Sequence, residues 1–269
     1  MNKLKANLSD IRQFDELSAG NSMIHRLDPC IKLVVTLAFI ITVTSFSKYD
    51  VSGLFPFFLY PAVLISTSNL PLLPLLKRLL LALPFVVFIS IFNPIFDRAP
   101  AMLLGNLSIS YGWISFFSIL TRSVLAIIAA LILIATTGID AICSALQRLK
   151  VPQALTIQIL FMYRYLYILF DEVQRTLQAH SLRKFQSHGI ESKVWGSLIG
   201  HLLIRTLDRA QRVYQAMLSR GFDGNVRMTR VTAVKRQDLL FAAIWLIFFL
   251  FARLINVSQW LGTLLTGGC

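Results

Sequence analysis

The sequence predicts an all-α integral membrane protein. Its 269 residues are 56% hydrophobic and 14% charged, with a mean hydropathy of +0.67, whereas soluble domains carry about 25% charged residues. The apolar residues gather in long segments, the pattern of helices that satisfy their own backbone hydrogen bonds in lipid. We expect about five transmembrane helices, with long cytoplasmic helices between the fourth span and the last.

A polar lead precedes the first two spans. Residues 1–30 are polar and basic, contain no apolar core of the kind found in cleavable signal peptides, and end in a turn at Asp28-Pro29. The apolar segment 31–46 is short for a span but usable. The second segment, 51–67, contains two prolines, which membranes tolerate where neighbouring groups satisfy the freed carbonyls.

Two further spans complete a predicted four-helix membrane bundle over 31–137. The third segment covers 79–96, and a polar loop separates it from the fourth, 113–137. Trp113 stands where an interfacial aromatic residue is expected. Arg122 lies in the first half of the fourth segment, and one arginine without a nearby carboxylate makes a poor ion path, so we expect it to have a structural role.

The region 138–237 is expected to form cytoplasmic or interfacial helices. Asp140 to Lys150 is predicted to be a short surface helix, because a proline follows it closely. The apolar stretch 155–170 is 16 residues long and contains an arginine. That length favours a buried or interfacial helix over a span, and a sixth span remains the alternative.

The distribution of charge orients these segments. The chain has 26 Lys and Arg against 13 Asp and Glu, a net charge of +13, and most of the excess lies within 171–236. Lys and Arg collect on the cytoplasmic side, so a cytoplasmic N-terminus and four spans place this basic region inside. The last transmembrane helix then covers 238–258 and leaves an external tail, 259–269. We expect a multi-pass protein of the plasma (inner) membrane, with no nucleic-acid partner.

One motif occurs twice in the basic region. Asp171–Phe185 and Asp208–Phe222 share the pattern D-x-x-Q-R-x-x-Q-A-x-x-x-R-x-F, 37 residues apart. Neither copy has Gly or Pro before its last arginine, so both are predicted to be helices. Each helix ends in an arginine, Arg183 or Arg220, which would suit a partner that offers the same socket twice. A chance match between two polar helices is the alternative.

The copies also share supporting positions. Asp and Arg stand four residues apart in each, a spacing that favours a pair on one helix face. The second copy continues an apolar stripe at helical spacing, which consists of Ile199, Leu202, Leu203, Leu207, Ala210, Tyr214, Met217 and Leu218. The predicted supporting positions are Asp171, Arg175, Gln178, Asp208, Arg212, Gln215 and Met217.

Gly221 is well placed to end the second helix. An arginine freed at that tip can enter an acidic groove and bind a carboxylate with two hydrogen bonds. An arginine that only complements the helix dipole is an equal alternative for Arg220.

Several kinds of site are missing from the sequence. It has no P-loop motif, so we do not expect this chain to bind ATP in that way. No acidic residue lies inside an apolar segment, where a cation-coupled carrier would keep one. The three cysteines and four histidines lack metal-ligand spacing. We therefore predict no catalytic residue, no metal site and no cofactor in this chain.

The second copy resembles the T component of energy-coupling factor (ECF) transporters. The resemblance is carried by the run RTLDRAQRVYQAMLSRGFDG, Arg205–Gly224, which looks like the CbiQ branch from cobalt and nickel importers. The entry LDPCIKL, Leu27–Leu33, is similar to the L-D-P-R-x-K-L of that family, with Cys30 in place of the usual Arg. The resemblance covers essentially the whole chain.

The resemblance implies a non-catalytic coupling subunit. T components of this family bind two copies of an ABC-type ATPase, which hold the ATP, and an S component that captures the substrate; a small accessory membrane subunit is a further option. The arginine triplets that end the two coupling helices, each docking into one ATPase, correspond to Leu182-Arg183-Lys184 and Ser219-Arg220-Gly221. The expected substrate is cobalt or nickel ions. The alternatives are the T subunit of a vitamin-specific or shared ECF transporter and, more remotely, a membrane-bound lipid or prenyl enzyme.

Overall fold

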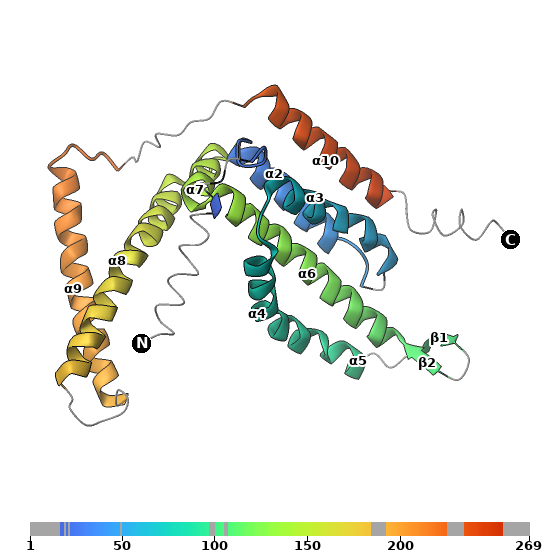
Figure 1. Cartoon of the computed structure of the whole chain (residues 1–269), viewed down its shortest axis with the longest axis horizontal. Helices are drawn as coiled ribbons and strands as arrows, with labels where there is room; N and C mark the ends of the chain where they lie inside the picture. The colour runs from blue at the N-terminus through green and yellow to red at the C-terminus, as the bar shows by residue number, and fades with distance from the viewer. Residues whose placement is uncertain are drawn as a thin grey trace. The chain divides into compact units, whose positions relative to one another are not determined.

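The computed structural model describes residues 17–18, 20, 22–48, 50–96, 100–104, 107–183, 192–224 and 234–254. Apart from one two-stranded hairpin, the described elements are helices (Figure 1), which confirms the all-α prediction. The chain divides into two compact units. We call Met1–Ala145 with Val231–Cys269 the bundle unit, and Leu146–Arg230 the arm unit.

The helices of the bundle unit follow the predicted order of apolar segments. They are α2 (Pro29–Thr44), η1 (Ser52–Phe58), α3 (Leu59–Ser68), α4 (Leu72–Ser90), α5 (Phe92–Phe96), α6 (Tyr111–Thr137) and α10 (Arg236–Leu254). The loop predicted before α6 contains two antiparallel strands, β1 (Pro100–Leu104) and β2 (Leu107–Ser110). The short helix α7 (Ile139–Arg148) follows α6, and the arm unit contains α8 (Gln153–Arg183) and α9 (Ser192–Leu218).

An aromatic cluster forms the core of the bundle unit. Phe39 of α2 stacks on Tyr60 of α3 with ring centroids 4.5 Å apart, and Trp245 of α10 meets Tyr60 edge-on at 4.8 Å. Leu125 and Ile132 of α6 are buried in the same cluster. Close packing of these large side chains fixes four helices that are far apart in the sequence.

Within the described residues, four helical stretches are long and apolar enough to cross a membrane by length and composition. They are Leu72–Ile95, Tyr111–Thr137, Gln153–Leu182 and Arg236–Leu254, and shorter apolar helices cover Pro29–Thr44 and Ser52–Ser68. Large apolar side chains also cover outer faces of the bundle helices; Leu81 of α4, for example, is 82% exposed. Lipid is the favourable surrounding for such a surface, and the chain is a multi-pass membrane protein.

Two helices are longer than the sequence predicted. α4 begins at Leu72 rather than at residue 79, because Pro71 precedes the helix and Pro74 falls in its first turn, where a missing N–H is harmless. The stretch 155–170, expected to form a short helix of its own, continues into the first repeat copy, and both lie on the 31-residue α8. Length therefore no longer argues against α8 as a span, and the choice between five and six spans stays a prediction.

Arg122 makes its contacts inside the bundle unit, as the structural interpretation expected. Its Nη2 donates to the carbonyl of Ser47, just beyond the end of α2. Arg253 of α10 donates to the neighbouring carbonyl of Ser45 at 3.1 Å and lies 4.3 Å from the ring centroid of Phe46. Two arginines thus hold the chain where α2 ends.

Candidate functional site

The two repeat copies lie on an antiparallel helix pair. Ala154, near the start of α8, lines the same groove as Phe222, beyond the end of α9. Further along, Glu172 of α8 forms a 2.9 Å ion pair with Arg205 of α9. Because each copy occupies the second half of its helix, the two arginine tips lie at opposite ends of the arm unit (Figure 1). A helix of 27 residues such as α9 is about 40 Å long.

A Schellman motif ends α9. The N–H of Phe222 donates to the Met217 carbonyl and the N–H of Gly221 donates to the Leu218 carbonyl, both at 3.0 Å. Gly221 has a φ of 79°, a left-handed conformation that glycine adopts at no steric cost. Gly221 therefore ends the helix where the sequence predicted, in a turn closed by two backbone hydrogen bonds.

Arg220 is the residue that this turn presents. Its backbone N–H donates to the Met217 carbonyl at 3.0 Å, so the backbone at the tip is held in place. Its side chain is exposed and has no hydrogen bond or ion pair with the described residues. The Ser219 hydroxyl bonds back to the Gln215 carbonyl at 3.0 Å and belongs to the last turn of the helix. The geometry leaves the guanidinium available to a partner.

The first tip is described in part. α8 ends at Arg183, and Leu182 beside it is 79% exposed. The Ser181 hydroxyl donates to the Gln178 carbonyl at 2.8 Å in the same last turn. Lys184, the third residue of the predicted triplet, lies outside the described residues. The first triplet thus begins at a helix end, as the second does.

The ion pairs predicted within each copy are not formed. Among the described residues, no salt bridge joins the Asp and the Arg of either copy, and the ion pair of this unit links the two helices through Glu172 and Arg205. Exposed pairs at this spacing contribute little, since water solvates both charges. Gln178 is half-buried and Gln215 is exposed. The four charged positions are all exposed: Asp171, Arg175, Asp208 and Arg212.

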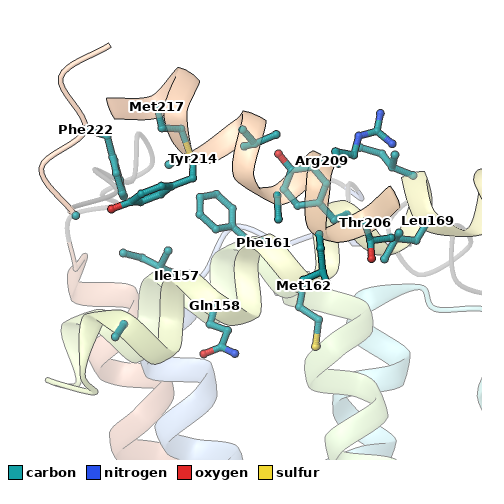
Figure 2. Close-up of a pocket in the computed structure, with 17 residues that line it drawn as sticks. Ile157, Gln158, Phe161, Met162, Leu169, Thr206, Arg209, Tyr214, Met217 and Phe222 are labelled. Atoms are coloured by element: carbon teal, nitrogen blue, oxygen red, sulfur yellow. The ribbon is translucent and has the colours of Figure 1, made fainter. Parts of the chain in front are cut away.

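An apolar groove of about 680 Å³ lies between α8 and α9. Figure 2 shows Phe161 and Ile157 on the α8 side, with Tyr214, Met217 and Phe222 on the side of α9. Met217 and Phe222 are the two positions of the Schellman motif that commonly make a hydrophobic contact. The groove and the Arg220 tip are therefore built from the same turn.

Half of the predicted apolar stripe lines this groove. Leu207, Ala210, Tyr214 and Met217 are lining residues, whereas Ile199, at 58% exposed, belongs to an outward face. The sequence pattern concerns one helix alone, so it does not show how the stripe divides between a groove and an open face.

Sequence reasoning assigned no place in the site to Phe161 and Phe222, which line the groove. For Phe222 the signal was present, because Phe is the last residue that the two repeat copies share. Phe161 lies in the apolar stretch before the first copy, where nothing in the pattern distinguishes it from its neighbours.

Two side chains that could carry chemistry, Cys143 and His25, are buried and half-buried. No group of three or more His, Cys, Asp or Glu side chains that could hold a metal ion occurs in the described part of the chain. Burial raises the pKa of the Cys143 thiol, which makes a thiolate nucleophile less accessible. His25 lies between the Ser22 hydroxyl and the Leu17 carbonyl, 2.6 and 2.9 Å from its ring nitrogens, and burial lowers its pKa. These contacts hold a turn together.

Comparison with known proteins identifies the family. Residues 20–231 match the model of the CbiQ family, described as cobalt transport protein. The chain is 28% identical to an energy-coupling factor transporter transmembrane protein EcfT of Ruminiclostridium cellulolyticum, over 88% of this chain and 94% of that protein. It is also 28% identical to the EcfT of Leuconostoc gelidum, over 82% of this chain and 87% of that one.

A third similar protein is an uncharacterized protein of Methanocaldococcus jannaschii, 26% identical over 85% of this chain and 81% of its own length. These alignments run through both the bundle unit and the arm unit, as does the family match. The chain belongs to the CbiQ family and is a T component of the energy-coupling factor transporters.

Proposed function

We propose that this chain is the T subunit of an importer for cobalt or nickel ions and transmits the movement of two ATPase subunits to a substrate-capturing membrane subunit. ATP is held by the ATPases, and this chain contributes no catalytic group. The observation that carries the proposal is the exposed Arg220 on a closed turn at one end of the arm unit, with Arg183 ending a helix at the other.

The chemistry of the two tips favours docking into an acidic groove. A guanidinium binds a carboxylate with two parallel hydrogen bonds, and this bidentate geometry requires a well-placed arginine. The Schellman motif supplies that placement at Arg220. Two tips at opposite ends of one antiparallel pair fit two copies of the same partner, one at each end.

The orientation in the membrane belongs to the proposal. The basic arm unit lies on the cytoplasmic side, where ATPases have access to ATP, and the N-terminus lies on the same side. This agrees with the concentration of Lys and Arg on the cytoplasmic side of membrane proteins. Cobalt is favoured over other substrates by the description of the family, cobalt transport protein.

A co-purification tests the docking role. The chain is expressed with its ATPase as wild type, as Arg183→Ala/Arg220→Ala, and as the control Arg164→Ala/Arg236→Ala, which removes two exposed arginines outside the repeat. Truncating one partner of a buried charge pair costs about 2–5 kcal/mol. We expect about two ATPase chains per subunit in wild type and control, by the proposed stoichiometry, and few in the double variant. Equal recovery in all three would refute docking through the tips.

The T subunit of a vitamin-specific or shared ECF transporter is the second candidate. It is favoured by the curated relatives, whose names specify an ECF transporter and no metal. Reconstituting the chain with its ATPase and with the capture subunit encoded beside it separates the two functions. Uptake of cobalt or nickel ions supports the metal importer, and uptake of a vitamin in their place supports the second candidate.

A further inference from the structure

A buried charged cluster lies in the bundle unit, where α2 and α10 begin. Asp28 is 1% exposed, Lys32 is 4% exposed and Asp238 is 3% exposed. Both carboxylates act electrostatically on the Lys32 ammonium group. Burying charges is unfavourable unless they are paired and hydrogen-bonded. We call these three side chains, with the Thr136 carbonyl that Lys32 binds, the Lys32 node.

The first contact of the node is made to the end of α6. Lys32 Nζ donates to the Thr136 carbonyl at 2.9 Å. The last four carbonyls of a helix have no partner within it and carry the negative end of its dipole, so an ammonium group is a favourable ligand there. Thr136 lies ten residues before Leu146, the first residue of the arm unit. The node therefore holds the end of α6, the helix that α7 and then the arm unit follow in the chain.

The second contact is made to the start of α10. Asp238 Oδ2 accepts from the N–H of Lys235 at 2.8 Å, which fixes the entry of the helix. Its Oδ1 accepts from the N–H of Asp28 at 3.3 Å. Asp238 lies eight residues after Arg230, the last residue of the arm unit. The node therefore also holds the start of α10, the first described helix after the arm unit.

The end of α6, before the arm unit, and the start of α10, after it, are thus both fixed to the first turn of α2. The Asp28 carboxylate completes the arrangement by accepting from the N–H of Cys30 at 2.9 Å, which caps α2. Apolar side chains of similar volume often stabilise a core as well as a buried ion network does. We therefore explain the charges at this position by specificity, because their hydrogen bonds define a single arrangement.

We propose that the Lys32 node is a positioning device, which fixes the bundle-unit helices that precede and follow the arm unit in the chain, so that movement of the arms reaches the bundle. The proposal rests on the coupling role of the arm unit proposed above. Lys32 is then a positioning residue, needed for uptake to follow ATP hydrolysis and not for the ATPases to bind. Without it, the arm unit would reorient without moving the spans.

The test compares Lys32→Met with Thr36→Val. Met keeps the length of the side chain and removes the charge and the donor. Thr36, one turn further along α2, is also buried, and its hydroxyl bonds the Lys32 carbonyl at 2.8 Å and the Tyr60 hydroxyl at 3.0 Å. The variants are reconstituted with their ATPase and capture subunits in liposomes. ATPase recovered per T subunit and metal ions imported per ATP hydrolysed are measured.

We expect Lys32→Met to recover as much ATPase as wild type and to import at least tenfold fewer ions per ATP, with Thr36→Val unchanged in both. Equal import per ATP in Lys32→Met and wild type would overturn the proposal. An equal loss in both variants would do the same, because it would indicate ordinary packing. If Lys32→Met does not fold, Asp238→Asn, which keeps the side-chain shape, carries the same test.

A second measurement keeps this proposal separate from the docking role. Spin labels are placed at Met23→Cys in the bundle unit and Leu203→Cys in the arm unit, both exposed positions, in the full chain without its native cysteines. The chain is studied alone in nanodiscs. We expect Lys32→Met to broaden the distance distribution at least twofold and Thr36→Val to leave it unchanged. An unbroadened distribution overturns the node, whatever the co-purification of the arginine variants shows.

Discussion

Replacing Gly221 by alanine isolates the contribution of the α9 turn. With a φ of 79°, Gly221 occupies a conformation in which a Cβ is unfavourable, and an added Cβ would meet no other atom within 4 Å. The cost is therefore local to the backbone, about 1–2 kcal/mol. The two hydrogen bonds that close the turn contribute about 0.5–1.5 kcal/mol each. Gly221→Ala should shift the balance between closed and open turn by roughly 5–30-fold.

The assay follows from the hydrogen bonds. The amide of Phe222 is protected by its bond to the Met217 carbonyl, so its hydrogen exchange should accelerate by the same factor in Gly221→Ala. ATPase affinity should fall as well, because Arg220 is no longer presented in one orientation. Both are measured on the purified chain, with and without its ATPase.

Gly221→Asn is the matched control. Asparagine enters the left-handed region far more readily than alanine, so exchange and affinity should stay closer to wild type. If alanine and asparagine behave alike, the backbone conformation at this position does not set the turn. If exchange accelerates while ATPase affinity is unchanged, the turn is real but docking does not depend on it.

The bundle unit gives three more expectations, each read from the melting temperature of the purified chain. Burial lowers the pKa of His25 below its ordinary 6.5, so the unfolded chain binds the proton more readily; stability is full above pH 6.5 and falls as the pH drops below it. His25→Gln should flatten that fall, and an unchanged pH profile would contradict the assignment. Arg253→Ala removes a carbonyl hydrogen bond and a cation over Phe46 and should cost about 1–2 kcal/mol. Arg253→Lys should recover only part of this, and full recovery would mean that charge alone matters. Phe39→Ala should cost about 3–5 kcal/mol through the cavity it leaves, whereas the exposed Phe85→Ala should change stability by less than about 0.5 kcal/mol; equal losses would refute the core described above.

The features that sequence predicted well depend on local signals. α6 and α10 are long apolar segments bounded by polar residues, and their bounds fall within a few residues of those expected. Gly221 ends α9 because a glycine after a helical pattern is the common signature of that turn. The repeat is also a feature of the sequence alone, because its two copies share one residue pattern.

The features that sequence missed depend on partners distant in the chain. Asp28 and Asp238 are 210 residues apart, and no spacing rule connects them. Glu172 forms its ion pair with Arg205 on the neighbouring helix and not with a residue at helical spacing on its own helix. Likewise, Phe161 can be identified as a groove residue only when α8 and α9 are known to pack side by side. The docking of Arg183 and Arg220 remains a prediction, because it concerns a surface that belongs to another protein.

The unbroken length of α8 has a mechanical consequence. Its 31 residues contain no glycine or proline, so the helix has none of the usual points at which a helix bends. A rod of this length extends for about 46 Å. By simple geometry, a rotation of about 10° at its Gln153 end would displace its Arg183 end by roughly 8 Å, more than one helical turn of 5.4 Å. A small angular change at one end of α8 therefore becomes a large displacement at the other, because the helix has no point at which to bend.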